Sequence, residues 1–123
     1  MTSYTILHNT RCSKSRKALQ ILKENSIALT VIEYLKAPLN KNQLTTLFSI
    51  LECSVRECIR TNESIYKELN LKDPNLSDDK IITIISQHPI LLERPIIYTN
   101  TKAIIGRPTE KIKPFLDETN KNY

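Results

Sequence analysis

The feature that most constrains the fold is a strand, a helix and a second strand within the first 36 residues. Residues 4–8 form a short apolar run, and residues 29–35 are rich in Val, Ile and Tyr, so both segments are predicted strands. Between them, residues 13–24 carry apolar side chains at helical spacing. Consecutive strands joined through a helix run parallel, so residues 1–36 are predicted to form a βαβ unit.

The middle of the chain, residues 40–88, is predicted to be helical. Asn40 followed by Gln43 is a capping-box pair ahead of apolar residues on one helical face. Two shorter helices are expected, over residues 54–60 and 62–69. A further helix is expected from the Ser-Asp-Asp sequence at 77–79, because serine is a favoured N-cap.

The last part of the chain predicts a β-hairpin and a helix. Two apolar runs, residues 95–98 and 102–105, flank a polar turn, and Pro108 stands at the start of the closing helix. Pro114 would cost about 3 kcal/mol inside a regular helix, so we expect an irregular start. Residues 95–117 form a predicted ββα unit. The predicted fold is α/β, a mixed four-stranded sheet with flanking helices and a helical insertion between the two halves.

Length and composition indicate one globular domain covering residues 1–123. A chain of 123 residues is a usual size for one domain, and 40% hydrophobic with 25% charged residues is an ordinary globular balance. No run approaches the roughly 18 apolar residues that span a bilayer, and the first residues lack the pattern of a secretory leader. Three cysteines are too few for a disulfide scaffold. We expect a cytoplasmic monomer with free thiols and no membrane partner.

The net charge of +5 favours a small anionic substrate over nucleic acid. The densest basic stretch, between Arg11 and Lys17, contains no aromatic residue, which argues against a nucleic-acid surface. A metal site is not expected, because the two histidines and three cysteines show no paired ligand spacing.

Cys12 is the predicted nucleophile. It follows a strand at the first turn of a helix, where unpaired N–H groups and the positive end of the helix dipole favour a thiolate. Arg11, Lys14 and Arg16 add positive charge, and such surroundings bring cysteine pKa values from about 8.5 to roughly 3.5–7.5. Nothing apolar flanks Cys12, so a buried packing role is the weaker interpretation.

The other thiols and the histidines are interpreted differently. Cys53 and Cys58 lie among apolar residues on predicted helices, where packing is expected. His8 ends the first strand and is placed to tune the pKa of Cys12, with a plain polar strand end as a nearly equal alternative. His88 is interpreted as a capping or surface group.

Spacing separates two kinds of thiol chemistry. A phosphatase loop follows the pattern CxxxxxR, whereas Arg16 follows Cys12 too early for that loop. A dithiol oxidoreductase has a second cysteine where this chain has Ser15. An external thiol is therefore the simplest source of the second sulfur.

Several stretches resemble the glutaredoxin-linked arsenate reductases, the ArsC-like family with a thioredoxin-like fold. The stretches are HNTRCSKSR at 8–16, IRT at 59–61, YKEL at 66–69, HPILLERPI at 88–96 and GRP at 106–108. They stand in the order and at the spacing of that family, so the likeness covers essentially the whole chain. One departure is Thr10, where many members carry proline.

The resemblance implies an oxyanion pocket of three arginines around the nucleophile, which match Arg60, Arg94 and Arg107. Guanidinium groups are always charged and offer forked donors that suit a tetrahedral anion. Pro95 matches the cis-proline that this fold places beside the active cysteine.

The resemblance also implies a reaction. The Cys12 thiolate attacks arsenic(V) of arsenate or a similar oxyanion, glutathione enters the adduct, and arsenite leaves. Glutaredoxin then clears a disulfide between Cys12 and glutathione. Glutathione is thus implied as co-substrate and no bound cofactor is implied, while Ser15 and Arg16 would support the thiolate.

Two other functional classes stay open. A redox-sensing regulator of the same fold, which binds RNA polymerase, resembles the first part of the chain. Such regulators carry CxxC and need no arginine pocket, so Ser15 with Arg94 and Arg107 favours the enzyme. A generic thiol-disulfide module would bind partner proteins and act on disulfides without depending on an oxyanion.

Overall fold

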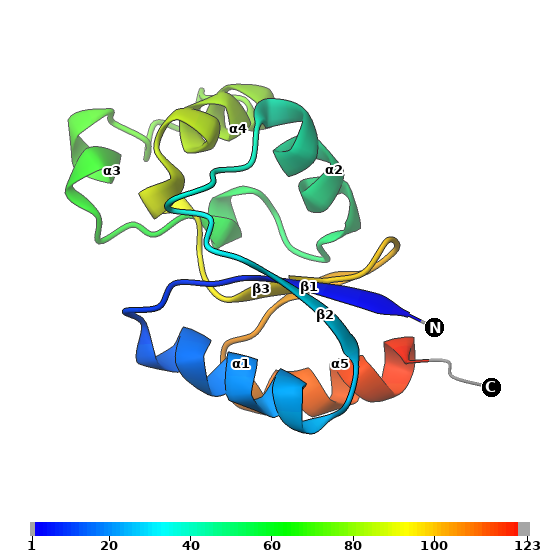
Figure 1. Ribbon diagram of the computed structural model, residues 1–123. Coiled ribbons are helices and arrows are strands. Elements are labelled where there is room, and N and C mark those ends of the chain that lie inside the picture. The colour runs from blue at the N-terminus through cyan, green and yellow to red at the C-terminus, as the bar shows by residue number, and fades with distance from the viewer. Residues whose placement is uncertain (1, 121–123) are drawn as a thin grey trace. The chain divides into compact units, whose positions relative to one another are not determined.

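The computed structural model describes residues 2–120, and its internal contacts divide the chain into two compact units. Unit 1 combines the residues up to 37 with those from 94 onward, whereas unit 2 is the continuous segment 38–93. The course of each unit can be followed in Figure 1. The interpretation of residues 1–123 as one domain stays a prediction.

Unit 1 is built on a four-stranded sheet with the strand order β2-β1-β3-β4. Strand β1 pairs in parallel with β2 and antiparallel with β3, and β3 pairs antiparallel with β4. The predicted mixed sheet with flanking helices is therefore confirmed. The elements of this unit are β1 (Ser3–Leu7), α1 (Ser13–Glu24), β2 (Ala28–Ile32), β3 (Ile96–Tyr98), β4 (Ala103–Ile105), the 3₁₀ turn η3 (Thr109–Lys111) and α5 (Ile112–Thr119).

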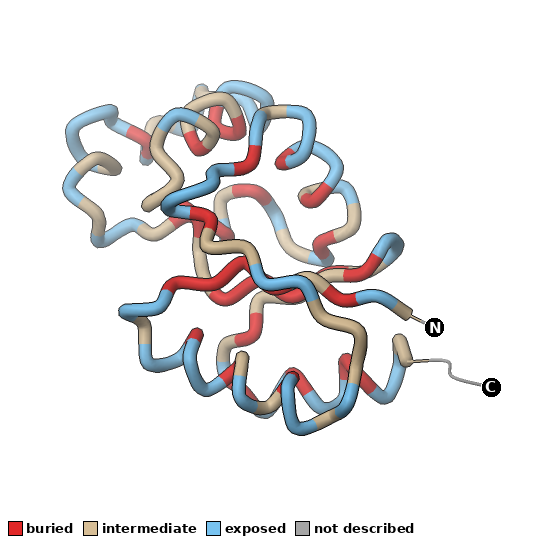
Figure 2. Tube along the Cα trace, in the orientation of Figure 1, coloured by how far each residue is buried: buried red, intermediate tan, exposed pale blue. Residues whose placement is uncertain are grey.

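Helices α1 and α5 lie side by side on one face of this sheet (Figure 1). Their apolar stripes meet the inward side chains of β1 and β3, and Figure 2 shows the buried residues gathered along these elements. The ring of Tyr4 meets that of Phe115 edge to face, with centroids 6.2 Å apart. The buried cluster consists of Tyr4, Ile6, Ala18, Leu22, Ile97, Ile112, Phe115 and Leu116.

The closing helix starts irregularly, as predicted. The turn η3 precedes α5, and Pro114 is the third residue of α5. In the first turn of a helix a backbone N–H has no intrahelical partner, so proline costs little there.

Unit 2 is helical, and its helix starts confirm the predicted caps. The Asn40 side chain accepts a bond from the Gln43 N–H, and the Gln43 side chain accepts one from the Asn40 N–H. The Ser77 hydroxyl accepts a bond from the Lys80 N–H. The elements are α2 (Lys41–Ile50), the 3₁₀ turn η1 (Arg56–Cys58), α3 (Ser64–Glu68), α4 (Asp78–Gln87) and the 3₁₀ turn η2 (Pro89–Leu91).

Three predicted boundaries are wrong for local reasons. The second strand ends at Ile32, because the Glu33 carbonyl accepts bonds from the N–H groups of Lys36 and Ala37 and turns the chain. The helix expected over 54–60 is only the short η1, since the Ser54 and Glu57 side chains bond to nearby backbone N–H groups.

The helix expected over 62–69 is reduced to α3, which has no side-chain N-cap bond and buries no residue of its own.

His88 is the C-cap of α4, as the capping interpretation predicted, and its N–H donates to the Ile84 and Ile85 carbonyls. None of the helices in residues 2–120 combines the length and the apolar character needed to cross a membrane.

Candidate active site

Cys12 is the N-cap residue of α1, in extended conformation, at the end of the loop that follows β1. Asn9 holds this loop from inside: its carbonyl accepts from the Cys12 N–H (3.1 Å) and its Oδ1 accepts from the Arg11 N–H (2.9 Å). The side chain of Arg16 donates to the Thr10 carbonyl (2.9 Å). Hydrogen bonds of Asn9 and of Arg16 therefore hold the loop that carries the Cys12 thiol.

The surroundings of the Cys12 sulfur favour its thiolate. Burial by itself raises the pKa of Cys12, but three hydrogen-bond donors outweigh that effect and hold the pKa below its ordinary value. The donors are the backbone N–H of Ser15, the guanidinium of Arg94 and the backbone N–H of Lys14. The charge of Arg94 acts in the same direction. The lowered pKa agrees in direction with the expectation for a helix N-terminus, but the charge that lowers it is that of Arg94 and not that of Arg11, Lys14 or Arg16. The role of Cys12 as nucleophile stays a prediction.

Arg94 is positioned by the start of β3. The Arg94–Pro95 peptide bond is cis, which confirms the implied conformation of Pro95. The Pro95 carbonyl accepts from the N–H of Gly106 (2.8 Å), which joins this turn to the end of β4. Arg107 Nη1 donates to the Arg94 carbonyl at 3.4 Å. Two of the three predicted pocket arginines thus lie on adjacent segments of unit 1.

His8 supports the loop through Ser15 rather than directly. Its Nδ1 lies 2.6 Å from Ser15 Oγ, and the same hydroxyl accepts from the Asn9 N–H (3.1 Å). Both His8 and Ser15 are buried. Burial lowers the pKa of His8; Glu33 raises it, and the positive charges of Lys23 and Arg16 lower it further, so the neutral ring is favoured.

Arg60 lies in unit 2, where it pairs with carboxylates. Its Nε donates to Glu63 (3.1 Å) and its Nη1 donates to Glu93 (3.0 Å). Burial lowers the pKa of Arg60, but the two carboxylates outweigh burial and raise it. Two anionic partners already hold this guanidinium, and its role toward a substrate oxyanion stays a prediction.

Cys53 and Cys58 also lie in unit 2, with their sulfur atoms 3.0 Å apart. Cys58 is fully buried, as the packing interpretation predicted, whereas Cys53 is only partly covered. Within residues 2–120 no group of three or more histidine, cysteine or acidic side chains is arranged to hold a metal ion.

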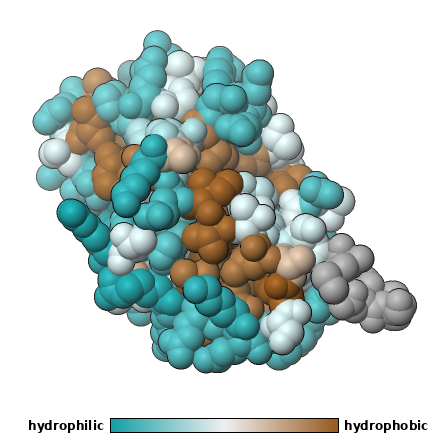
Figure 3. All heavy atoms as spheres, in the orientation of Figure 1, coloured by the Kyte–Doolittle hydropathy of each residue, from teal (hydrophilic) through white to brown (hydrophobic). Residues whose placement is uncertain are grey.

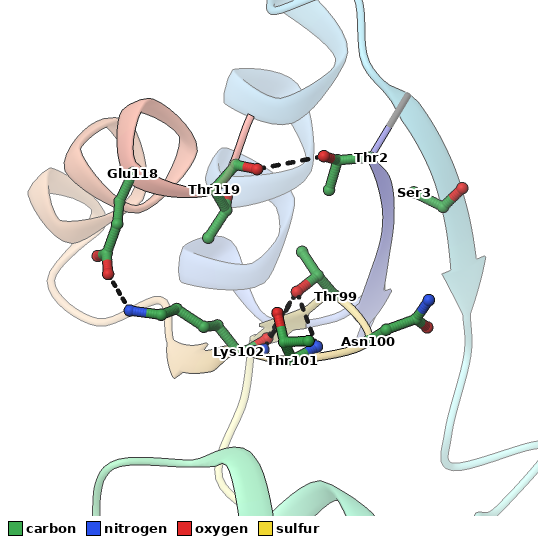
Figure 4. Close-up of a pocket in the computed structure, with 8 residues that line it drawn as sticks. All are labelled: Thr2, Ser3, Thr99, Asn100, Thr101, Lys102, Glu118 and Thr119. Atoms are coloured by element: carbon green, nitrogen blue, oxygen red, sulfur yellow. Dashed lines mark hydrogen bonds and ion pairs between the residues drawn. The ribbon is translucent and has the colours of Figure 1, made fainter. Parts of the chain in front are cut away.

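A polar depression lies away from this chemistry. It is lined by Thr2 and Ser3 at the start of β1, by the hairpin turn that includes Thr99, and by Glu118 and Thr119 of α5 (Figure 4). Lys102 and Glu118 pair across it. Cys12 follows the opposite end of β1, so this depression does not belong to the thiol site.

Sequence reasoning missed two contributions to the site. Asn9 organises the loop through both its backbone and its side chain, and the N–H of Lys14 stabilises the thiolate. Asn9 had a signal, because asparagine before a helix commonly bonds to the backbone two residues on. The part played by Lys14 had none, since it uses a backbone group that every residue except proline possesses.

Taken together, these contacts describe a nucleophile beside fixed cationic donors. A thiolate attacks electrophilic centres, and adjacent guanidinium groups stabilise negative charge on an oxyanion. The exposed face of α1 is hydrophilic (Figure 3), and its exposed residues include Lys14, Arg16 and Lys17. The site is therefore suited to an anionic, electrophilic substrate.

Comparisons with known proteins agree with this chemistry. A model of the ArsC family matches residues 7–115. The arsenate reductase of Neisseria meningitidis strain Z2491 is 45% identical over 117 residues, 94% of this chain and 100% of that protein. The uncharacterized protein YfgD of Escherichia coli K12 is 47% identical over 108 residues, 87% of this chain and 91% of that protein. The solved structure of an arsenate reductase from Vibrio cholerae is 42% identical, with a TM-score of 0.87, over 92% of this chain and 97% of its own.

Proposed function

The chain belongs to the ArsC family, and from that premise we propose that it reduces arsenate to arsenite through the thiolate of Cys12. Membership agrees with the resemblance found in the sequence and with the thioredoxin-like sheet. The names of its relatives favour neither the polymerase-binding regulator nor the generic thiol-disulfide module.

The observation that carries the proposal is the position of the Arg94 guanidinium beside Cys12, where its hydrogen-bonding groups and charge lower the pKa of the thiol. A cation at this position stabilises the attacking thiolate in the free enzyme. It also remains beside the sulfur when an anionic substrate arrives, so it offsets the repulsion between two negative charges. Arg107, whose Nη1 donates to the Arg94 carbonyl, supplies a second guanidinium next to Arg94.

The proposed reaction consumes two thiols. The Cys12 sulfur attacks arsenic(V), an As–S bond forms, and an oxygen leaves arsenic as water. Glutathione adds to the arsenic of this adduct and displaces a second oxygen as water. An S–S bond then forms between Cys12 and glutathione as both As–S bonds break: one bonding pair makes the S–S bond, the other stays on arsenic and reduces it to arsenic(III), and one water adds to give arsenite. Glutaredoxin restores Cys12 with a further thiol.

The donors and the setting are parts of the same proposal. Ser15 occupies the position where a dithiol enzyme has its second cysteine, so the resolving sulfur comes from outside the chain, with glutathione as co-substrate. Arg60 is proposed as the third guanidinium of the substrate pocket. A cytoplasmic location fits a reaction that needs reduced glutathione.

The test is a coupled assay of arsenate-dependent NADPH oxidation with glutathione, glutaredoxin and glutathione reductase. Wild type is compared with Arg94→Ala, Arg94→Lys and Cys12→Ser, and with Lys72→Ala as a control for loss of an exposed positive charge elsewhere. We expect no turnover from Cys12→Ser, a large loss in Arg94→Ala and partial recovery in Arg94→Lys. Lysine keeps the charge but not the forked donors.

Three results would change or reject the proposal. Full turnover by Cys12→Ser would remove this thiol from the mechanism. Turnover that needs thioredoxin and its reductase in place of glutathione and glutaredoxin would keep the reaction and change the donor. Absence of any arsenate-dependent oxidation by wild type, with either donor, would reject arsenate as the substrate.

A further inference from the structure

The two remaining cysteines lie closer together than packing alone requires. The Cys53 and Cys58 sulfur atoms are 3.0 Å apart, about 1 Å more than the S–S bond length of about 2.04 Å. Only the four residues 54–57 separate the two cysteines, and both belong to unit 2. A short closure of the bend between α2 and η1 would bring the sulfurs to bonding distance.

The two thiols differ in how firmly they are held. Cys58 ends η1, and its carbonyl accepts from the Glu93 N–H at 2.8 Å. The neighbouring Arg56 anchors the same turn through bonds to the Leu71 carbonyl (2.9 Å) and the Asp73 carbonyl (2.6 Å). Cys53 lies outside the helices, on the bend that follows α2. Cys58 therefore lies on a turn held by several hydrogen bonds, whereas Cys53 lies on a bend outside the helices.

They also differ in access. Cys58 is fully buried, and its thiol donates to the Ser54 carbonyl at 3.4 Å. Burial raises the pKa of the Cys58 thiol, and its neighbour Cys53 raises it further. Cys53 is partly exposed and so is the thiol that a small oxidant reaches first. An accessible sulfur backed by a buried one is the arrangement of a reactive cysteine with its resolving partner.

We propose that Cys53 and Cys58 form a second redox site, which hydroperoxides convert to an intramolecular disulfide. The Cys53 sulfur attacks the nearer peroxide oxygen, the O–O bond breaks, and a sulfenic acid forms as the leaving oxygen departs as water or an alcohol. The Cys58 sulfur then attacks the Cys53 sulfur. The S–O bond breaks, the S–S bond forms, and the hydroxyl leaves as water with the Cys58 proton. The two thiols lose two electrons, and the peroxide gains them.

This site uses different side chains from the proposed arsenate chemistry, because it needs neither Cys12 nor any of the three proposed pocket arginines, Arg60, Arg94 and Arg107. The disulfide would be opened again by an external dithiol through exchange. Its formation links the end of α2 to η1 inside unit 2. The same chain would then respond to peroxide at Cys53 and Cys58 and to oxyanions at Cys12.

The experiment uses the full chain with Cys12→Ser, so that Cys53 and Cys58 are the two remaining thiols. Hydrogen peroxide is added stepwise, and free thiols are counted after denaturation. We expect the count to fall from two to zero, the chain mass to drop by two hydrogen atoms, and dithiothreitol to restore both thiols. Trypsin cuts after Arg56, so without reductant peptides 42–56 and 57–60 should remain joined.

The control is Cys12→Ser with Cys53→Ser, in which we expect the buried Cys58 to stay reduced at the same dose. Peptide mapping of peroxide-treated wild type should show the same link and needs no variant to fold. The proposal is overturned if both thiols persist at peroxide doses that fully oxidise Cys12 of the wild type. It is equally overturned if the joined peptides come only from cross-linked dimers.

Discussion

Ser15 contributes to the thiol site through two different groups. Its backbone N–H stabilises the Cys12 thiolate, while its hydroxyl bonds to His8 and to the Asn9 N–H inside the protein. A substitution that removes only the hydroxyl separates these contributions, because the backbone group stays in place.

For Ser15→Ala we expect the free energy of unfolding to fall by about 1–3 kcal/mol, since the buried His8 nitrogen and Asn9 N–H each lose the hydroxyl. Urea unfolding measures this loss. The matched control is Ser13→Ala, which removes an exposed hydroxyl on the same helix turn and should change stability by less than about 0.5 kcal/mol. Equal effects of the two variants would contradict a supporting role for the Ser15 hydroxyl.

Arg94 should set the ionisation of Cys12. In Arg94→Ala the sulfur loses a hydrogen-bond donor and a positive charge, so the pKa of Cys12 should rise. The measurement is the rate of alkylation by iodoacetamide against pH, whose midpoint should move upward from wild type to Arg94→Lys to Arg94→Ala. Lys14→Ala is the control, because its contribution to the thiolate comes from a backbone N–H that alanine retains.

His8 should make stability depend on pH in a defined direction. Burial lowers its folded pKa below the unfolded value near 6.5, so between these two values the unfolded chain binds more protons. The contribution of the neutral ring is complete above about 6.5 and is lost as the pH falls through the folded pKa. Urea midpoints at a series of pH values should decline less steeply for His8→Asn than for wild type.

For individual residues, the sequence predicted the direction of the Cys12 pKa shift better than it predicted which side chains bond to each other. The helix position of Cys12 was sufficient to predict the direction of its pKa shift, because the backbone N–H groups of Lys14 and Ser15 are close to it along the chain. The predicted charges of Arg11, Lys14 and Arg16 were the wrong ones, since the charge that acts on the thiol is that of Arg94, far along the chain. The bond between His8 and Ser15 had no signal in the sequence, because it depends on how β1 and α1 are placed, and an effect of His8 on the pKa of Cys12 stays a prediction. Arg56 gave no signal, since its acceptors are carbonyls 15 to 20 residues further along the chain.

Among the elements, those with strong local signals were predicted well. The bounds of α1 agree with its apolar spacing, and the capping residues of α2 and α4 act as expected. The predicted second strand was too long at its end, because Tyr34 and Leu35 continue its apolar pattern into the turn that follows β2. Backbone bonding to Glu33 ends the strand there, and spacing of apolar residues carries no information about such a bond.

The turn between β4 and η3 should not tolerate a side chain at Gly106. A Cβ atom there would lie 3.1 Å from Pro95 Cγ and 3.3 Å from Ile97 Cδ1. Both neighbours are buried, so Gly106→Ala should lower the free energy of unfolding by about 1–3 kcal/mol. Thermal unfolding measures the loss, with the exposed hairpin residue Asn100→Ala as control; a neutral Gly106→Ala would show that the turn can give way.

For the molecule as a whole, charge complements the local site. The chain carries a net charge of +5, and the Arg94 guanidinium lies beside the Cys12 sulfur, so an anion should be drawn to Cys12. Salt screens such attraction over about 10 Å at 0.1 M ionic strength. The dependence on reagent charge can be measured without knowing the natural substrate.

Iodoacetate and iodoacetamide alkylate thiolates by the same reaction, but only iodoacetate is an anion. In a Cys53→Ser background, where the other remaining thiol, Cys58, is buried, both reagents report on Cys12. Both rates are proportional to the fraction of Cys12 that is thiolate, so their ratio does not depend on that fraction. The ratio therefore reports the electrostatic potential at the Cys12 sulfur. We expect sodium chloride to lower this ratio and Arg107→Ala to lower it at low salt, while Lys72→Ala leaves it nearly unchanged. A ratio that ignores both salt and Arg107 would mean that the positive charge of the chain does not act at the thiol, and an oxyanion substrate would lose its electrostatic support.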